Sequence, residues 1–131
     1  SQGDPTRETI LRANELVTRV DVPDRTGWRS TYIKFKERGS FDWALSAVAL
    51  AVRMNGDEVA EARLCLGGVA PVPWRCRSTE ELLVGKKLDD ATAKEAGEDA
   101  LRGAEPLEHN GYKIPLTKAL IAKAVRRLAN A

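Results

Sequence analysis

The sequence changes its periodicity once, at two adjacent glycines that are followed by two prolines. Gly67 and Gly68 end a stretch in which apolar and polar residues alternate, and Pro71 and Pro73 remove amide donors that a central strand would need. Before this point the alternation has the two-residue period of β-strands, and after it apolar residues recur at helical spacing. We therefore expect strands first and helices second, an order typical of the α+β class.

Two short runs before the glycines predict strands. Residues 16–22 alternate apolar and charged side chains and stop at Pro23, which predicts a half-buried strand. Residues 31–37, TYIKFKE, alternate in the same way and place Tyr32 and Lys34 on one face. That face of the second strand is polar and carries an aromatic ring.

A long β-hairpin is expected next. Residues 40–54, SFDWALSAVALAVRM, are apolar for long enough to form a helix or a buried strand, and periodicity alone does not decide. The dipeptide Asn55-Gly56 favours a type I′ turn, and residues 58–68 alternate again, with Glu61 one step out of register. The turn signal favours two paired strands over a helix.

Three helices are expected after the prolines. Ser78 and Glu81 have the spacing of a capping box for a helix over residues 78–85, which Gly85 would end. Further helices are expected from Asp89 or Asp90 to about residue 102 and over residues 112–129. Their apolar stripes consist of Ala93, Ala96, Ala100 and Leu101, and of Leu116, Leu120, Ile121, Ala124, Val125 and Leu128.

These patterns predict an α+β fold with an antiparallel β-sheet of about three to four strands, followed by about three helices packed on one face of the sheet. The polar residues 1–10 are expected to form a flexible N-terminal segment, and residues 11–131 a single domain. A chain of 131 residues has material for one core and little for a second.

Composition excludes several classes of function. Lysine and arginine number 21 against 19 aspartates and glutamates, and the charges are interspersed, so nucleic acid and an anionic membrane are not expected partners. No apolar run reaches the roughly 20 residues that span a bilayer, and the N-terminus does not resemble a secretory signal. A soluble, cytoplasmic protein is expected.

The chemically reactive residues are few and scattered. Cys65 and Cys76 fit neither a redox pair nor half of a tetrahedral metal site, so both are expected to be free thiols, with Cys65 a small core residue. The only histidine, His109, lies in a polar loop. No glycine-rich phosphate loop or zinc motif is present. We therefore expect no metal site and no catalytic residues in this chain.

Packing in a hydrophobic core does not explain the residue types in two stretches of the sequence. Residues 32–44, YIKFKERGSFDWA, bring a polar strand face close to Arg38, Asp42 and Trp43. In residues 67–75, GGVAPVPWR, glycines permit a close backbone approach and prolines stiffen the exit from the sheet, which Trp74 would anchor against the helices.

Five segments resemble, in order and spacing, the C-terminal domain of the FAD-binding (medium) subunit of molybdenum hydroxylases, the family of xanthine dehydrogenase and carbon monoxide dehydrogenase flavoproteins. The segments are ELVTRVDVP, SFDWALSAVALAVRM, EARLCLGGVAPVPWR, ELLVGKKL and NGYKIPLTKALIAKAVRRL. The resemblance covers about Leu11 to Ala129. It implies an antiparallel sheet backed by three helices, in agreement with the patterns above.

The resemblance also implies a function. Enzymes of this family hydroxylate a substrate at a molybdenum cofactor and pass electrons through [2Fe–2S] clusters to FAD, which an external acceptor reoxidises. Two upstream domains, absent from this chain, hold most of the FAD, and the C-terminal domain closes over part of the isoalloxazine ring. The chain would thus be part of an oxidoreductase, inactive alone, and its partners would be those upstream domains and the molybdopterin and [2Fe–2S] subunits.

Within the resemblance, Lys34 matches a lysine that reaches the flavin ring, and Tyr32 matches a neighbouring aromatic residue on the same face. These two are the expected cofactor-binding residues. Arg38 and Asp42 are expected to form a structural ion pair or to cap a turn, and Trp43 to pack. The alternative is a subunit-docking or self-association module that makes no contact with flavin.

Overall fold

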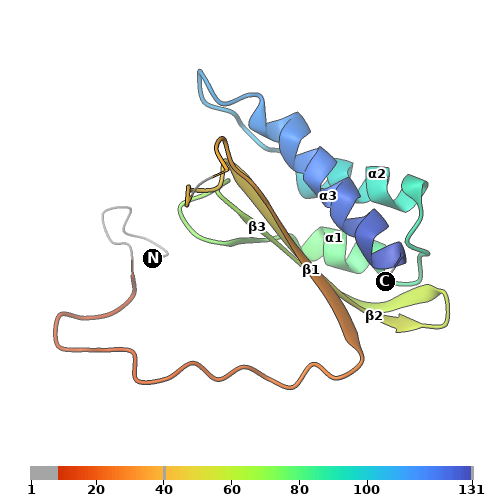
Figure 1. Ribbon diagram of the computed structural model, residues 1–131, viewed down its shortest axis with the longest axis horizontal. Helices are drawn as coiled ribbons and strands as arrows, with labels where there is room; N and C mark the ends of the chain where they lie inside the picture. Colours follow the sequence, from red (N-terminus) through yellow and green to blue (C-terminus); the bar gives the residue numbers. More distant parts are fainter. Residues whose placement is uncertain (1–8, 40, 131) are drawn as a thin grey trace.

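The computed structural model describes residues 9–39 and 41–130. Four strands, β1 (Trp28–Phe35), β2 (Ser46–Asn55), β3 (Glu58–Gly67) and β4 (Trp74–Arg75), precede three helices, α1 (Arg77–Leu83), α2 (Asp90–Ala100) and α3 (Lys113–Ala129). The strands form one antiparallel sheet in the order β1-β2-β3-β4 (Figure 1). The predicted α+β class is confirmed. Of the N-terminal segment predicted to be flexible, all but Thr9 and Ile10 lies outside the described residues.

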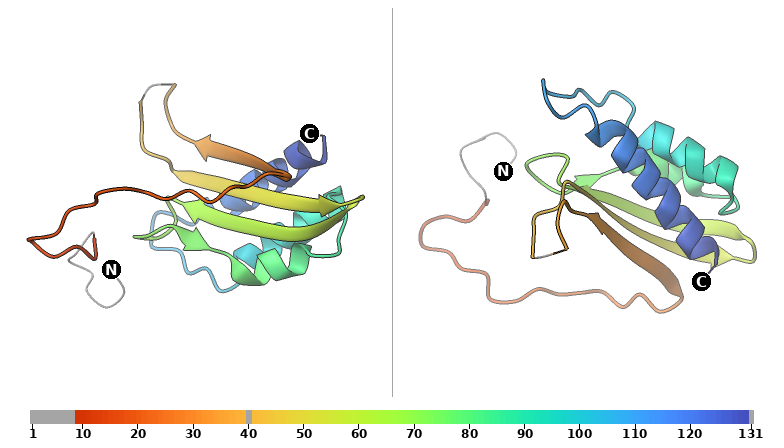
Figure 2. Two further views of the ribbon diagram at one scale, coloured as in Figure 1. Left: turned by 90° about the horizontal axis from the view of Figure 1, so that it is seen from below. Right: turned by 45° about the horizontal axis from the view of Figure 1, so that its top comes forward.

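The helices cover one face of the sheet and leave the other open (Figures 1 and 2). Because side chains alternate along a strand, the large apolar residues of β2 and β3 all point to the helices and form the core with them. The buried core residues of the two strands are Val48, Leu50, Val52, Val59, Ala62, Leu64 and Leu66, and those of the helices are Leu83, Ala93, Ala96, Leu120, Ile121, Ala124, Val125 and Leu128. The predicted helical stripes thus face this common core.

Small residues on α2 let it pack closely against α3. A Cβ atom added at Gly97 would lie 3.4 Å from the carbonyl oxygen of Lys118 on α3. Glycine is a poor helix former, and its place in the middle of α2 is explained by this contact. Between α3 and the sheet, the buried hydroxyls of Ser46 and Thr117 satisfy each other at 2.7 Å.

The β2–β3 hairpin is confirmed, but its turn differs from the prediction. Asn55 pairs with Glu58, so the two central residues are Gly56 and Asp57 rather than Asn55 and Gly56. Only Gly56 has a positive φ, +60°, whereas a type I′ turn needs positive φ at both central positions. The dipeptide signal therefore located the hairpin correctly and the turn type wrongly.

The register of the hairpin shifts between Arg53 and Met54. Arg53 pairs with Glu61 and Met54 with Val59, so Ala60 is the extra residue of a β-bulge. This irregularity explains why Glu61 is one step out of the alternation in the sequence.

The strand predicted over residues 16–22 is absent from this structure. The segment has no regular secondary structure, and its apolar side chains Leu16, Val20 and Val22 are 76%, 80% and 81% exposed. A strand is stable only when it pairs with a neighbour and covers an apolar layer, and no described part of the chain offers it both. The prediction was therefore wrong for this chain as it stands.

The start of α1 differs from the predicted capping box. The helix begins after Cys76, which makes no side-chain cap, and neither Ser78 nor Glu81 bonds to the helix start. The backbone N–H of Cys76 donates to the carbonyl of Leu64 at 3.0 Å, so sheet pairing continues to the first residue before the helix. The sheet, rather than a side chain, fixes where α1 begins.

Two predicted helix boundaries are confirmed. The side chain of Asp89 accepts a hydrogen bond of 2.7 Å from the backbone N–H of Thr92 and caps α2. After α1, Gly85 has a φ of +78°, and its N–H donates to the carbonyl of Val59 at 2.8 Å. These contacts tie the helix ends to the rest of the fold.

Candidate functional site

The open face of the sheet brings the predicted site residues together with residues of three other strands. Tyr32 of β1, Ala49 of β2, Cys65 of β3 and Arg75 of β4 form one row across the sheet. Tyr32 is exposed, and the next residue, Ile33, is buried toward the helices. The strand therefore presents Tyr32, and Lys34 two residues on, to the side opposite the helices.

Small side chains make the centre of this face flat. On β2 the half-buried Ala49 and Ala51 point outward, as does Ala47, which is itself buried beside its β3 neighbour Gly67. These three outward positions of β2 therefore carry no large side chain, and the next one, Arg53, lies toward the hairpin turn. A planar group can lie on such a floor more closely than on branched side chains.

An open cavity of about 520 Å³ lies over this floor. Tyr32, Ala49, Ala51 and Cys65 are among its lining residues. Its volume falls in the range of roughly 300–1,000 Å³ that is typical of small-molecule sites. Lys34 is not among the lining residues, and it has no ion-pair partner within residues 9–39 and 41–130.

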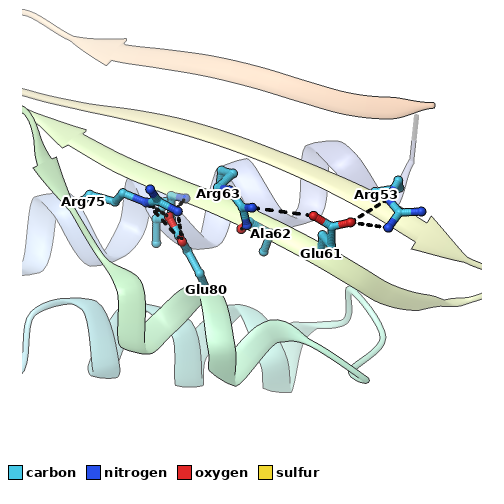
Figure 3. A network of polar contacts seen from close by, with 7 residues as sticks. Arg53, Glu61, Ala62, Arg63, Arg75 and Glu80 are labelled. Carbon is cyan, nitrogen blue, oxygen red and sulfur yellow. Dashed lines mark hydrogen bonds and ion pairs between the residues drawn. The ribbon is translucent and has the colours of Figure 1, made fainter. Parts of the chain in front are cut away.

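An ion pair between β4 and α1 closes one side of the cavity (Figure 3). Arg75 Nε donates to Glu80 Oε1 at 2.9 Å and Nη2 donates to Oε2 at 2.8 Å. Glu80 Oε1 also accepts the backbone N–H of Leu64 at 2.9 Å. Burial alone would raise the pKa of Glu80, but the hydrogen bonds from Arg75 and Leu64 outweigh it and hold that pKa below its usual value. The carboxylate is therefore ionised, and both of its oxygens accept hydrogen bonds within the protein.

Two further arginines, Arg25 and Arg63, line the cavity. The guanidinium carbons of Arg25 and Arg63 lie 5.2 and 5.6 Å from the ring centre of Trp28, within cation–π range. Glu61 is hydrogen-bonded by Arg53, which lowers the pKa of Glu61, and its other oxygen lies 3.6 Å from Arg63 (Figure 3).

The electrostatic balance of the cavity is therefore positive. Arg25, Arg63 and Arg75 line it, and the one lining carboxylate, Glu80, is already paired. This setting favours a ligand that is electron-rich or gains negative charge. Sequence reasoning missed the three arginines, although Arg63 could have been found as an outward position between the core residues Leu64 and Ala62.

The two cysteines lie in different environments. Both are free, as predicted, but Cys65 lies half-buried on the open face, whereas Cys76 is buried in the core. The core assignment of Cys65 was wrong because its apolar neighbours, Leu64 and Leu66, are the residues that point inward. Burial raises the pKa of both thiols, that of Cys76 to about 11.

The thiol environments predict slow and ordered alkylation. At pH 7.5 iodoacetamide should modify Cys65 before Cys76. Cys76 should react at least about tenfold more slowly in the folded protein than in the denatured chain, since little thiolate forms at a raised pKa. Mass spectrometry of peptides from timed samples measures both rates, with guanidinium-denatured protein as control. Equal rates for the two cysteines in the folded protein would contradict these environments.

The tryptophans expected to pack are exposed. Trp43 is 92% exposed in the β1–β2 loop, and Trp74 is 54% exposed on β4. The loop extends past the end of the sheet, where no helix lies opposite it (Figure 1). Asp42 caps the turn by accepting the backbone N–H of Trp43 at 2.9 Å, and no ion pair with Arg38 forms among the described residues.

Gly68 has the close backbone approach expected at the end of β3. Its φ is +71°, and a Cβ atom there would lie 2.8 Å from the carbonyl oxygen of Ala44. The carbonyl of Gly68 accepts a hydrogen bond of 2.9 Å from Lys113 Nζ at the start of α3. Gly68 thus joins two loops and a helix at one end of the sheet.

The described residues contain neither a metal-binding cluster nor a membrane-spanning helix. Within 9–39 and 41–130, no three His, Cys, Asp or Glu side chains are grouped so that they could hold a metal ion. None of the described helices is long and apolar enough to cross a membrane. His109 is exposed in the loop before α3, as predicted, with Glu108 at 3.7 Å.

Comparison with known proteins decides the family. The family described as the CO dehydrogenase flavoprotein C-terminal domain matches residues 30–128. This chain belongs to that family. The resemblance to the medium, FAD-binding subunits of molybdenum hydroxylases is confirmed, since curated relatives with these descriptions also match.

Relatives and a solved structure extend the match. The glyceraldehyde dehydrogenase medium chain of Sulfolobus acidocaldarius is 35% identical over 92% of this chain and 44% of its own length. The aldehyde oxidoreductase FAD-binding subunit PaoB of Escherichia coli is 30% identical over 92% of this chain and 35% of its own. One solved structure is the carbon monoxide dehydrogenase of Hydrogenophaga pseudoflava that lacks the Mo-pyranopterin moiety of the molybdenum cofactor. It superimposes on this chain with a TM-score of 0.72 and is 28% identical in sequence. The superposition covers 80% of this chain and 38% of the other.

The CO dehydrogenase flavoprotein C-terminal domain is thus present with its fold. The chain spans less than half of each of these relatives. The matches to the two curated relatives include residues 15–22, because each covers 92% of the chain, whereas the domain match begins at residue 30.

Proposed function

We propose that this domain covers part of the isoalloxazine ring of FAD, which upstream domains of the same subunit hold by its other parts. The observation that carries the proposal is the open sheet face, where Ala49 and Ala51 form a floor beneath a cavity of about 520 Å³. A flat, small-residue floor with one aromatic ring and a positive rim fits a planar ring system that gains negative charge on reduction. Bound FAD would supply two-electron redox chemistry.

The chain's own residues would orient and stabilise that ring. Tyr32 lines the cavity and would stack on the ring or donate a hydrogen bond to it. Lys34 lies on the same strand face and would place its ammonium group near the ring edge that becomes negative on reduction. The charge of Lys34 is available for this role because no described carboxylate pairs with it.

We further propose that the domain works in electron transfer from [2Fe–2S] clusters to an external acceptor. Its partners would be the upstream FAD-binding domains and the molybdopterin and [2Fe–2S] subunits of a holoenzyme. The support is the family match and the medium-chain descriptions of the relatives. The cytoplasmic location expected from the sequence stays a prediction.

Replacing Lys34 by alanine tests the flavin contact in the intact subunit. Without its cation the reduced, anionic ring loses stabilisation, so we expect the midpoint potential to fall by about 30 mV or more, a tenfold change for a two-electron couple. Spectroelectrochemical titration of the bound flavin measures the potential. Lys34→Arg should restore most of it, and Lys123→Ala, on the exposed side of α3, should leave it unchanged. An unchanged potential in Lys34→Ala would remove Lys34 from the site.

The second candidate function is subunit docking or self-association without flavin contact. The exposed aromatic side chains of Phe41 and Trp43 in the β1–β2 loop favour it, because large apolar groups at the surface are common in interfaces. The Lys34→Ala experiment separates the two functions, since docking alone predicts an unchanged flavin.

A further inference from the structure

Three arginines from separate parts of the chain line the open cavity in excess over carboxylates. Arg25 precedes β1, Arg63 lies on β3 and Arg75 on β4. Among the described residues that line the cavity, Glu80 is the one acidic side chain, and Arg75 binds both of its oxygens through Nε and Nη2. Two positive charges are therefore left without a carboxylate of their own at one cavity.

Two of these guanidinium groups are held at one indole ring. The guanidinium carbons of Arg25 and Arg63 lie 5.2 and 5.6 Å from the ring centre of Trp28. A cation–π contact uses the face of a guanidinium and leaves the N–H groups at its edge for hydrogen bonds. Two like charges beside one ring repel each other, and an anion bound to both would relieve that repulsion.

The donors of the same two arginines are mostly unused. Within the described part of the chain, Arg25 forms no hydrogen bond or ion pair through its side chain. Arg63 donates from Nη1 to a neighbouring backbone carbonyl at 2.7 Å, and its Nη2 lies 3.6 Å from Glu61. Arg53 is the closer partner of Glu61 (Figure 3). The fork of Arg25 and the Nε–H of Arg63 are therefore available to a ligand.

A hydroxyl group lies in the same row of the sheet as Arg63. Ser30 of β1 pairs with Ala51 of β2, which pairs with Arg63 of β3. Ser30 is exposed, lines the cavity and can donate a hydrogen bond beside Arg63. Ser30 and Lys34 are four residues apart, a distance of about 13 Å along a strand. A ligand at Arg63 and a ring near Lys34 can therefore be bound at the same time.

We propose that Arg25, Arg63 and Arg75 form a binding site for a phosphate or diphosphate group. Such a group carries about two negative charges at neutral pH, which matches the excess of positive charge. Planar guanidinium forks fit its oxygens, and Arg75 adds its remaining Nη1 donors. The group belongs either to FAD, as its diphosphate, or to a separate phosphorylated molecule. The site goes beyond the proposed function and does not require Lys34 to touch the flavin ring.

Titration of the 131-residue chain with inorganic pyrophosphate tests the site without flavin. Two-dimensional NMR spectra at constant ionic strength follow the indole N–H of Trp28 and the backbone amide of Arg63. Both signals should shift and reach saturation, because a defined site fills. Shifts that grow without saturation, or that spare these two signals, would overturn the proposal.

Three arginine variants of the chain separate a site from a response to net charge. Arg25→Ala and Arg63→Ala should each weaken pyrophosphate binding by about tenfold or more, since each removes charge-assisted hydrogen bonds. Arg29→Ala loses the same charge from an exposed position of β1 that faces the helix side, and binding should change by less than about twofold. Equal losses in all three variants would contradict the site. Arg25 lies outside the strands, so its variant decides the question even if Arg63→Ala does not fold.

The intact, FAD-loaded subunit distinguishes the two sources of the phosphate group. Pyrophosphate that binds there, and binds more weakly to Arg63→Ala, identifies the ligand as a separate phosphorylated molecule. Loss of pyrophosphate binding, with FAD released about tenfold or more readily from Arg63→Ala, identifies it as the diphosphate of FAD. The absence of both effects would overturn the proposal for the assembled protein.

The anion site and the flavin contact fail separately. Saturable pyrophosphate binding, with a flavin potential that Lys34→Ala does not change, would keep the anion site and remove the flavin contact. A shifted potential without pyrophosphate binding to the 131-residue chain would do the reverse.

Discussion

Replacing Glu80 by alanine should lower the free energy of unfolding by about 2–3 kcal/mol. The side chain of Glu80 is 8% exposed, and its carboxylate holds both the guanidinium of Arg75 and the N–H of Leu64. Removal of one partner from a buried pair typically costs roughly 3–5 kcal/mol. Arg75 is 41% exposed and can be solvated in part, so the expected cost is at or somewhat below the lower end of that range.

The effect is large because Glu80 completes the edge of the sheet. β4 consists only of Trp74 and Arg75, which pair with Leu66 and Cys65. The carboxylate of Glu80 then accepts the next free N–H of β3, that of Leu64, where a longer β4 would have offered a carbonyl. Alanine would leave this donor without a partner in a buried position.

Urea unfolding followed by circular dichroism measures the loss, and Glu81→Ala is the matched control. Glu81 lies next to Glu80 on α1 but is exposed, so its replacement should change stability by less than about 0.5 kcal/mol. Similar losses in the two variants would show that the effect comes from the helix and not from the ion pair.

The stability loss in Glu80→Ala should depend on pH. The pKa of Glu80 in the folded protein is below its usual value of 4.5, so the stabilisation from its ionised form is complete above that pH and is lost as the pH falls through the lowered folded-state pKa. The stability difference between the wild type and Glu80→Ala should therefore shrink below about pH 4.5. A difference independent of pH from 7 to 3 would contradict a role for the charged pair.

Gly68→Ala should destabilise the domain by at least about 2 kcal/mol. The left-handed backbone at φ +71° costs an alanine roughly 1–2 kcal/mol. The added methyl group would also lie 2.8 Å from the carbonyl oxygen of Ala44, a backbone atom that cannot rotate away. The loops must then separate, and the hydrogen bond from Lys113 to the carbonyl of Gly68 is weakened with them.

Gly67→Ala is the control for this substitution. Gly67 precedes Gly68, has no positive φ, and would place its methyl group at an ordinary 3.5 Å from the Cβ of Ala47. We expect a change within about 1 kcal/mol, read from thermal and urea unfolding of the two variants side by side. Equal destabilisation would mean that the close approach at Gly68 relaxes easily.

Local pattern was sufficient to predict most of the architecture. Alternation along residues 31–37 placed Tyr32 and Lys34 on one face, and the helical spacing of Leu120, Ile121 and Ala124 identified the buried side of α3. These properties depend on the period of a single element. They can be read without knowing which elements are neighbours.

The cavity depended on pairings between distant elements. Arg63 of β3 and Arg75 of β4 meet around it with Arg25, from the turn before β1, because the strands pair in a particular order, which no single segment encodes. The same limit explains the error at residues 16–22, since the period of a strand is local but its pairing partner is not. Exposure of Trp43 likewise depends on what lies opposite its loop.

The extra residue at Ala60 has a consequence for how this domain can change in length. In a regular ladder, one inserted residue near the hairpin turn would move every later side chain of β3 to the opposite face. The bulge already absorbs one residue between the tip and the part of β3 that carries Arg63 and Cys65. Insertions and deletions at Gly56 and Asp57 can therefore be accommodated at the tip while the open face keeps its side chains.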